Sequence, residues 1–265
     1  MLAKTHIAGP VSTGTTDSGV YYEVHGAAGP PLFLGFPVTA SPEAIPAFGG
    51  SRIAPRFLAS LTDRYRVLVA DYPSIGRSAT VPVGEFTVDR VCDDLLGVAD
   101  AAGFHQFAWW GGTFGAIAGL LLATRSDRVS ALVSAGWPPL GGPYAAMLAG
   151  TRLNLSNPPE HARAILREPA QYAQWVTFYE SLDGWPDQVE AVAGIQCPRM
   201  VVFGANAEAD VGGIPLRPAA TIREHRAQLE LQGWKVVEVP DHDSSLILDP
   251  ETLTPIVRQF LDGLI

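Results

Sequence analysis

The run Gly111-Gly112-Thr113-Phe114-Gly115 places one hydroxyl between glycines, where a short apolar segment gives way to a second apolar segment. A hydroxyl on a very tight strand-to-helix turn projects away from both elements, as a nucleophile must. The flanking glycines are needed because a side chain there would collide with the strand or the helix. A glycine-rich turn can also cradle a phosphate, but neither G-x-G-x-x-G nor a P-loop lysine is present. The spacing therefore predicts a nucleophilic Thr113 on a strained turn.

A hydroxyl nucleophile needs a base, and His242 is the candidate. It would take the proton from the Thr113 hydroxyl and later return it to a leaving group. Of the six histidines, it alone follows the last predicted strand by a short turn. We expect its ring within hydrogen-bond reach of Thr113, directly or through one water. The remaining histidines are interpreted as surface or packing residues: His6, His25, His105, His161 and His225.

Short apolar runs alternate with longer amphipathic stretches along the chain. The apolar runs predict strands at residues 19–25, 31–34, 66–70, 107–110, 129–134, 200–203 and 236–239. The amphipathic or apolar stretches predict helices at residues 87–102, 114–124, 219–232 and 252–264. Continuous apolar strands are typical of parallel sheets that are covered on both faces. The alternation indicates an α/β fold with a doubly wound, mostly parallel sheet.

Residues 137–195 interrupt this alternation. They contain no convincing strand, and they combine Pro and Gly with aromatic residues in helix-like pieces. We interpret them as a helical cap above a core made of residues 1–136 and 196–265. A cap rich in aromatic side chains favours a small apolar substrate. An ordinary helical excursion that packs on the core would show the same pattern.

The chain resembles the α/β-hydrolase superfamily over nearly its whole length. Four segments carry the resemblance in the expected order: L-G-F-P at 34–37, D-Y-P-S-I-G-R-S at 71–78, the G-x-T-x-G turn at 111–115, and D-H-D at 241–243. The chain departs from the usual motifs at Leu34, commonly histidine, at Ser74, commonly glycine, and at Thr113, commonly serine. The resemblance implies a nucleophile elbow at Thr113 and a catalytic-histidine loop around His242.

The same resemblance implies an oxyanion hole made of backbone N–H groups. The two donors would be the N–H of Phe36, in the turn after the second apolar run, and the N–H of Phe114, directly after the nucleophile. Because these donors belong to the backbone, the departure at Leu34 leaves this role intact. Both phenylalanine side chains would also serve as pocket wall.

The acid of the triad is the least defined member. The family usually places it as G-x-x-D after the strand predicted at 200–203, which here falls on Ala207. An alanine cannot orient a histidine, so the acid would be Asp210 or Glu208 in a longer loop. We prefer Asp210 because residues 211–215 resemble the usual continuation. The alternative is that both carboxylates are merely solvated.

Composition bounds the remaining possibilities. The chain has 265 residues, of which 47% are hydrophobic, enough for a substantial core. Its net charge of −9 argues against nucleic-acid binding, which needs a basic surface. We expect no membrane span and no signal peptide, and a cytoplasmic protein whose Cys92 and Cys197 are thiols. No metal or organic cofactor is implied, and the oligomeric state is left open.

The first interpretation is hydrolysis of a carboxylic ester or lactone with an apolar portion, with Thr113 as nucleophile and His242 as base. The extra methyl of threonine restricts χ1 and crowds the attack. Two alternatives therefore stay open. One is a ligand-binding protein that has lost catalysis; the other is a lyase, cyclase or cofactor-free oxygenase on the same scaffold, because fold alone does not fix chemistry.

Overall fold

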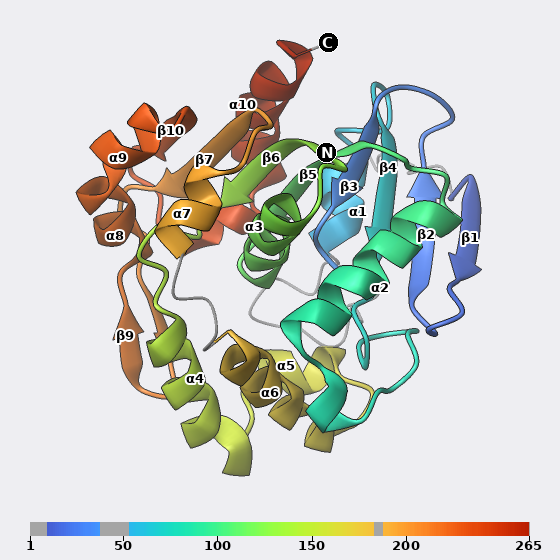
Figure 1. The fold of residues 1–265 in the computed structure, drawn as a ribbon, viewed down its shortest axis with the longest axis vertical. Coiled ribbons are helices and arrows are strands. Elements are labelled where there is room, and N and C mark those ends of the chain that lie inside the picture. Colours follow the sequence, from blue (N-terminus) through green and yellow to red (C-terminus); the bar gives the residue numbers. More distant parts are fainter. Residues whose placement is uncertain (1–9, 38–52, 183–187, 265) are drawn as a thin grey trace, which may run out of the picture.

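A computed structural model describes residues 10–37, 53–182 and 188–264 of the chain, and in these residues the main sheet has eight strands (Figure 1). The spatial order is β1-β2-β4-β3-β5-β6-β7-β10. The strands are β1 (Ser12–Thr15), β2 (Tyr21–His25), β3 (Pro31–Leu34), β4 (Arg66–Ala70), β5 (Phe107–Gly112), β6 (Val129–Ala135), β7 (Arg199–Gly204) and β10 (Trp234–Val239). β1 and β2 pair antiparallel, and every pair from β4 to β10 is parallel. The predicted fold class is confirmed.

The inner strands bury both of their faces. Successive side chains of a strand point to opposite sides. Accordingly Phe33 and Trp109 belong to one buried cluster, whereas Leu34 and Trp110 belong to the other. All four side chains are at most 1% exposed. This double burial explains why these strands read as continuous apolar runs rather than as an alternating pattern.

Helices cover each face of the sheet. The cluster on one face includes residues of α2 (Val88–Ala101), α3 (Phe114–Arg125), α7 (Gln188–Ala193), α8 (Pro218–Glu224) and α9 (Arg226–Leu231). The cluster on the other face includes residues of α1 (Ile53–Leu58) and α10 (Pro250–Asp262). This two-sided cover matches the predicted doubly wound arrangement. The single helix predicted at 219–232 is instead two helices that meet at His225.

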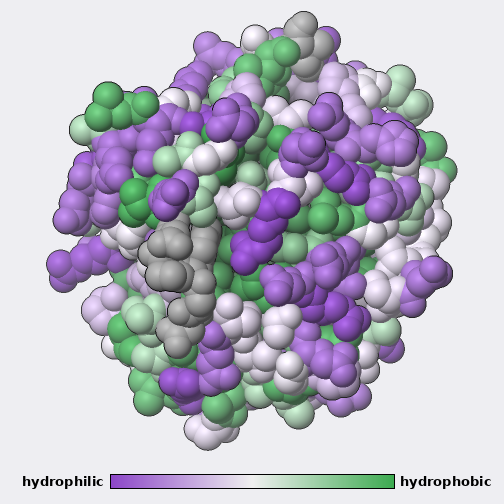
Figure 2. Space-filling model, in the orientation of Figure 1, coloured by the Kyte–Doolittle hydropathy of each residue, from purple (hydrophilic) through white to green (hydrophobic). Residues whose placement is uncertain are grey.

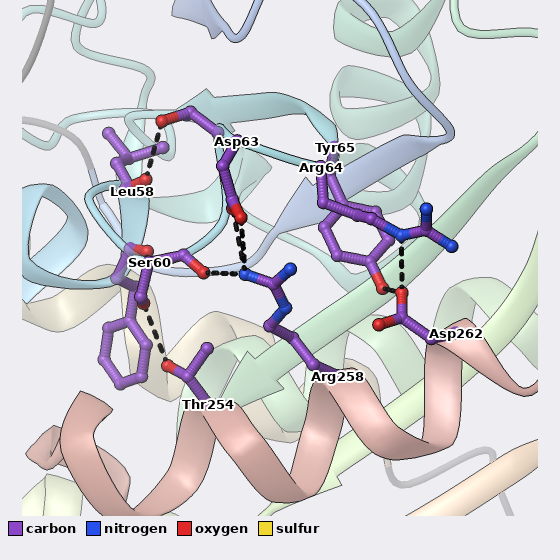
Figure 3. Close-up of polar contacts among 10 residues, drawn as sticks. Leu58, Ser60, Asp63, Arg64, Tyr65, Thr254, Arg258 and Asp262 are labelled. Atoms are coloured by element: carbon purple, nitrogen blue, oxygen red, sulfur yellow. Dashed lines mark hydrogen bonds and ion pairs between the residues drawn. The ribbon is translucent and has the colours of Figure 1, made fainter.

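Polar contacts fasten α10 to the segment between α1 and β4 (Figure 3). The Arg258 guanidinium donates to the Ser60 carbonyl at 2.9 Å and pairs with the Asp63 carboxylate at 2.9 Å. One turn further along, Asp262 accepts a hydrogen bond from the Tyr65 hydroxyl at 2.5 Å. These contacts hold the C-terminal helix, and with it the loop that precedes it, in a fixed position against the sheet.

The helical insertion follows β6 and ends before β7. Its elements are α4 (Tyr144–Leu153), the 3-10 turn η3 (Asn154–Ser156), α5 (Glu160–Ile165), the 3-10 turn η4 (Pro169–Ala173), α6 (Gln174–Ser181) and α7. In Figure 1, α4, α5 and α6 gather beyond the ends at which the parallel strands finish. The insertion also contacts the core through an isolated bridge between Ile75 and Leu166. The division into a core and a cap at 137–195 stays a prediction.

Several short elements outside the insertion were absent from the predicted elements, among them the helix α1. β1 joins the edge of the sheet, and a hairpin of β8 (Ala209–Val211) and β9 (Ile214–Leu216) follows β7. The turn of the hairpin, Gly212-Gly213, has φ of 59° and 80°, which glycine adopts without strain. The hairpin packs on α4, where a Cβ on Gly150 would lie 2.2 Å from the Val211 carbonyl oxygen. The segment interpreted as a loop is therefore a hairpin against the insertion.

The surface carries both hydrophilic and hydrophobic residues. On the face drawn in Figure 2, hydrophilic and hydrophobic residues are interspersed. Among the described residues, no helix combines the length and the apolar character that crossing a membrane requires.

The two cysteines, Cys92 and Cys197, carry free thiols. Burial raises the pKa of the Cys92 thiol to about 12, so this thiol is protonated at neutral pH.

Candidate active site

Thr113 sits between the end of β5 and the start of α3. Its backbone has φ 48° and ψ −116°. A positive φ is a genuine outlier for a β-branched residue, because its Cβ crowds the backbone. The predicted sharp and strained turn at Thr113 is confirmed. The side chain is exposed on this turn, and no hydrogen bond of its hydroxyl is found within the described part of the chain.

The turn requires glycine at positions 111 and 115, because backbone atoms already occupy the space that a side chain would need. A Cβ on Gly111 would lie 2.2 Å from the Gly115 carbonyl oxygen, and a Cβ on Gly115 would lie 2.0 Å from that of Gly35. The indole N–H of buried Trp109 donates to the Gly115 carbonyl at 2.8 Å. The turn is thus fixed from three sides, which is how surrounding structure sustains a strained residue.

The two proposed oxyanion donors belong to the turns that follow β5 and β3. Phe114 is the first residue of α3, so its N–H has no acceptor within the helix. Phe36 follows Gly35, whose N–H donates to the Trp110 carbonyl at 2.8 Å and thereby fixes the turn. Neither N–H of the two phenylalanines donates a hydrogen bond inside the described segments. Both groups are therefore available to a ligand oxygen, and the N-terminus of α3 adds a favourable dipole.

His242 lies in the turn after β10. Its Nδ1 is 2.7 Å from the Pro240 carbonyl oxygen. Because a carbonyl only accepts, Nδ1 carries the proton and Nε2 is left as an acceptor, the tautomer that a general base needs. The backbone of the turn is held by Asn206, whose N–H donates to the His242 carbonyl at 2.8 Å. In the described residues no hydrogen bond joins the His242 ring to Thr113, so their predicted pairing stays a prediction.

The two candidate acids occupy different positions around the β8–β9 hairpin. Asp210 lies within β8, and one of its carboxylate oxygens accepts from the Gly213 N–H at 3.0 Å. Glu208 precedes the hairpin, and its backbone carbonyl accepts a hydrogen bond from the Ser244 hydroxyl. No hydrogen bond links either carboxylate to His242 within the described chain. Ala207, at the position usual for the acid, is 2% exposed.

A cavity of about 430 Å³ opens at Thr113. The strand ends, the insertion and the hairpin all contribute to its wall. Thr113, Phe36, Phe114 and Asp210 line it together, whereas His242 and Glu208 are not part of the lining. From the loop after β10, Asp243 and Ser244 line the cavity instead. Most of the remaining wall is apolar, including Ile117, Trp137, Met147, Trp175, Leu216 and Ile247.

Sequence reasoning missed polar residues of this lining. Asp243 caps the 3-10 turn η5 (Ser244–Leu248), where its carboxylate accepts from the Ser245 N–H at 2.8 Å. The hydrogen bonds from Ser245 lower the pKa of Asp243, so the group is ionised at neutral pH. His161 of α5 also lines the cavity, and burial lowers its pKa, which favours a neutral imidazole. A carboxylate that begins a turn after the last strand is a signal that the sequence does contain.

The site residues offer no evident metal centre. Among the residues that the structure describes, no group of three or more His, Cys, Asp or Glu side chains is placed to hold a metal ion. The cavity is lined by the Thr113 hydroxyl, the backbone of Phe36 and Phe114, one histidine (His161) and carboxylates, and His242 precedes the lining residue Asp243. This set suits acyl transfer, because Thr113 is a candidate nucleophile and the two N–H groups are candidate donors to a developing oxyanion.

Comparisons with known proteins agree with this geometry. A family model described as alpha/beta hydrolase fold matches residues 44–179. A putative carbamate hydrolase RutD of Caulobacter segnis is 28% identical and aligns with 96% of this chain and 100% of its own length. The crystal structure of E-2-(acetamidomethylene)succinate hydrolase has a TM-score of 0.68 at 19% identity, with 95% and 99% of the two chains covered. The enol-lactonase of Burkholderia xenovorans has a TM-score of 0.67 at 19% identity, with 95% and 100% covered.

Proposed function

Since the chain belongs to the alpha/beta hydrolase fold family, we propose that it hydrolyses a carboxylic ester or lactone with an apolar portion. The observation that carries this proposal is the strained backbone of Thr113, φ 48°, at the mouth of a largely apolar cavity. Strained residues persist where function requires a particular presentation of a side chain. The names of the relatives, a putative carbamate hydrolase and an enol-lactonase, give further support for acyl chemistry.

In the proposed reaction, the Thr113 hydroxyl attacks the substrate carbonyl carbon while His242 Nε2 takes the hydroxyl proton. The N–H groups of Phe36 and Phe114 stabilise the oxyanion of the tetrahedral intermediate. When the C–O bond to the leaving alcohol breaks, His242 returns the proton to that oxygen, and an acyl-threonine remains. Water then attacks the acyl group while His242 takes its proton, and the acyl bond to Thr113 breaks as His242 returns that proton to the Thr113 oxygen, which releases the acid. Asp210 would stabilise the protonated imidazole.

A second candidate function is ligand binding without turnover. It is favoured by one specific arrangement: Ala207 occupies the usual position of the acid in the cavity wall, and the His242 ring donates to a backbone carbonyl rather than to a carboxylate. A triad that lacks its acid orients the base less well, and the rate falls accordingly. The cavity and its apolar wall would serve a retained ligand equally well.

Substitution His242→Gln tests the proposal. We expect wild type to hydrolyse p-nitrophenyl butanoate, and we expect the variant to lose at least about 100-fold in kcat, the usual contribution of a general base. The measurement is steady-state turnover across pH, with His105→Gln as the matched control outside the cavity lining. An unchanged kcat in the His242 variant would exclude His242 as the base. Wild type that turns over no apolar ester or lactone, yet binds them, would favour the second candidate.

A further inference from the structure

A buried tyrosine of the insertion has a hydroxyl that no described residue of the chain pairs. Tyr179 belongs to α6, is 5% exposed and forms part of the cavity wall. No hydrogen bond of its hydroxyl is found among the described residues, and the polar side-chain atoms that are fully enclosed there without a partner belong to other residues. The hydroxyl therefore meets open space, which is that of the cavity. A ligand that displaces water from it without offering an acceptor leaves it unpaired.

The other tyrosines of the described lining differ in this respect. The Tyr72 hydroxyl donates to a backbone carbonyl at 3.1 Å. The Tyr172 hydroxyl has side-chain hydrogen bonds with Asn154 and Thr151. In both cases the protein itself satisfies the hydroxyl, so these rings contribute mainly apolar surface to the cavity. Tyr179 is thus the tyrosine of the described wall whose hydroxyl is available to a ligand.

Packing fixes Tyr179 relative to the nucleophile turn. The preceding residue, Phe178, is 0% exposed, and its ring centroid lies 4.9 Å from that of Phe114, the residue directly after Thr113. The rings of Phe178 and Tyr179 also contact each other edge to face, with centroids 5.4 Å apart. The helix α6 is therefore anchored on the residue next to the candidate nucleophile. A ligand whose carbonyl lies at Thr113 can present a second group to Tyr179 from within the same cavity.

The Tyr179 hydroxyl is a neutral donor. Burial, together with the neighbouring hydroxyls of Tyr144 and Tyr172, raises the pKa of Tyr179 above its ordinary value, so the group keeps its proton at neutral pH. A protonated phenol donates a hydrogen bond to an oxygen acceptor. No Lys or Arg is found in the described lining, so an anionic acceptor would have no cation of that wall beside it. The arrangement favours a neutral acceptor such as a keto or ether oxygen.

We propose that Tyr179 is a specificity-determining residue, whose hydroxyl donates a hydrogen bond to a second, neutral oxygen of the substrate beyond the reacting carbonyl. This inference rests on the proposed function for the place of the reacting carbonyl, and it names the substrate class of that same cavity. The selected substrates are esters or lactones whose apolar portion carries a keto or ether oxygen. Analogues with a methylene group in place of that oxygen bind less well, because they leave the buried hydroxyl unpaired.

The test measures binding rather than turnover, so that its outcome does not depend on catalysis. The probes are heptane-2,6-dione, octane-2,7-dione and nonane-2,8-dione, whose two carbonyls can reach the oxyanion donors and Tyr179 together at different spacings. Dissociation constants are measured by ligand-observed NMR with the full chain, in wild type and in Tyr179→Phe. We expect at least one dione to bind about 10-fold more weakly to the variant, because the substitution removes the donor and keeps the ring.

Tyr172→Phe is the matched comparison, because it removes the same atom from the same wall. The Tyr172 hydroxyl already has its partners in Asn154 and Thr151, so we expect each dione to change by less than about 2-fold. Butylbenzene, which has no oxygen, is measured with every protein to show that the cavity is still formed. Its affinity should differ by less than about 2-fold between wild type and Tyr179→Phe, because the ring surface is retained.

Dione affinities that Tyr179→Phe leaves intact at every length would overturn the inference, as would an equal loss in Tyr172→Phe. A wild type that binds butylbenzene but none of the diones would overturn it as well. The two proposals fail separately. Dione binding that depends on Tyr179, without hydrolysis of any ester, would refute the hydrolase function alone. Ester hydrolysis combined with dione binding that ignores Tyr179 would refute only the specificity.

Discussion

Thr113→Ala is expected to reduce ester turnover by at least about 1,000-fold, because removal of a nucleophile leaves only catalysis by the oxyanion donors. Thr113→Ser is expected to keep or raise turnover of small activated esters. Serine retains the hydroxyl and removes the methyl that restricts χ1 and crowds the attack. It also relieves the cost of placing a β-branched residue at φ 48°. The measurement is kcat for p-nitrophenyl butanoate in the three proteins.

The two variants control for each other. Both are smaller than threonine, so a loss caused by an altered cavity would affect serine and alanine alike. Binding of 4-phenylbutanol, an apolar probe of the cavity, is measured alongside to show that each variant still forms the cavity. Equal kcat in wild type and Thr113→Ala would exclude Thr113 as the nucleophile. A serine variant as inactive as the alanine variant would show that the methyl group is needed rather than tolerated.

Gly115→Ala is expected to lower the free energy of unfolding by more than about 3 kcal/mol, or to prevent the folded state from accumulating. The added Cβ would lie 2.0 Å from the Gly35 carbonyl oxygen. Gly35 cannot retreat easily, since its N–H donates to the Trp110 carbonyl and its own carbonyl accepts from the Tyr72 hydroxyl at 3.1 Å. The clash therefore falls on backbone that is fixed from both sides.

Urea denaturation of the variant is compared with that of Gly97→Ala. Gly97 lies in α2, and a Cβ there meets nothing within 4 Å. Alanine favours the helix over glycine, so this control should be neutral or more stable by about 0.5–1 kcal/mol. Should both variants unfold at the same denaturant concentration as wild type, the close packing of the turn against Gly35 would be wrong.

The sequence predicts the central elements well because burial on both faces leaves a clear signal. β3 and β4 have the predicted bounds, 31–34 and 66–70, and α3 differs from its prediction by one residue. The misses include the six-residue helix α1 and short strands in which this signal is weak. β1 is an edge strand whose four residues are exposed or partly exposed, and the β8–β9 hairpin has strands of three residues. Pairing with neighbours, rather than local pattern, determines such short strands.

For the site too, features with a local sequence signal are predicted and features that depend on tertiary contacts are not. The position of Thr113 follows from glycine spacing, because the collision between strand and helix is local. The lining of the histidine loop does not follow from spacing. Asp241 has φ of 57°, a conformation that spacing does not reveal, and after it Asp243 and Ser244 line the cavity whereas His242 does not. Such a turn depends on tertiary contacts, among them the bond from the Asn206 N–H to the His242 carbonyl.

Covalent labelling of Thr113 tests the central claim most directly. The protein is incubated with an alkyl fluorophosphonate, and the adduct is followed by intact mass and located in the tryptic peptide spanning 91–125. A nucleophilic Thr113 displaces fluoride, so we predict one adduct per chain on Thr113, retained in Thr113→Ser and lost in Thr113→Ala. An unlabelled Thr113 in a protein that binds 4-phenylbutanol would contradict a nucleophilic threonine.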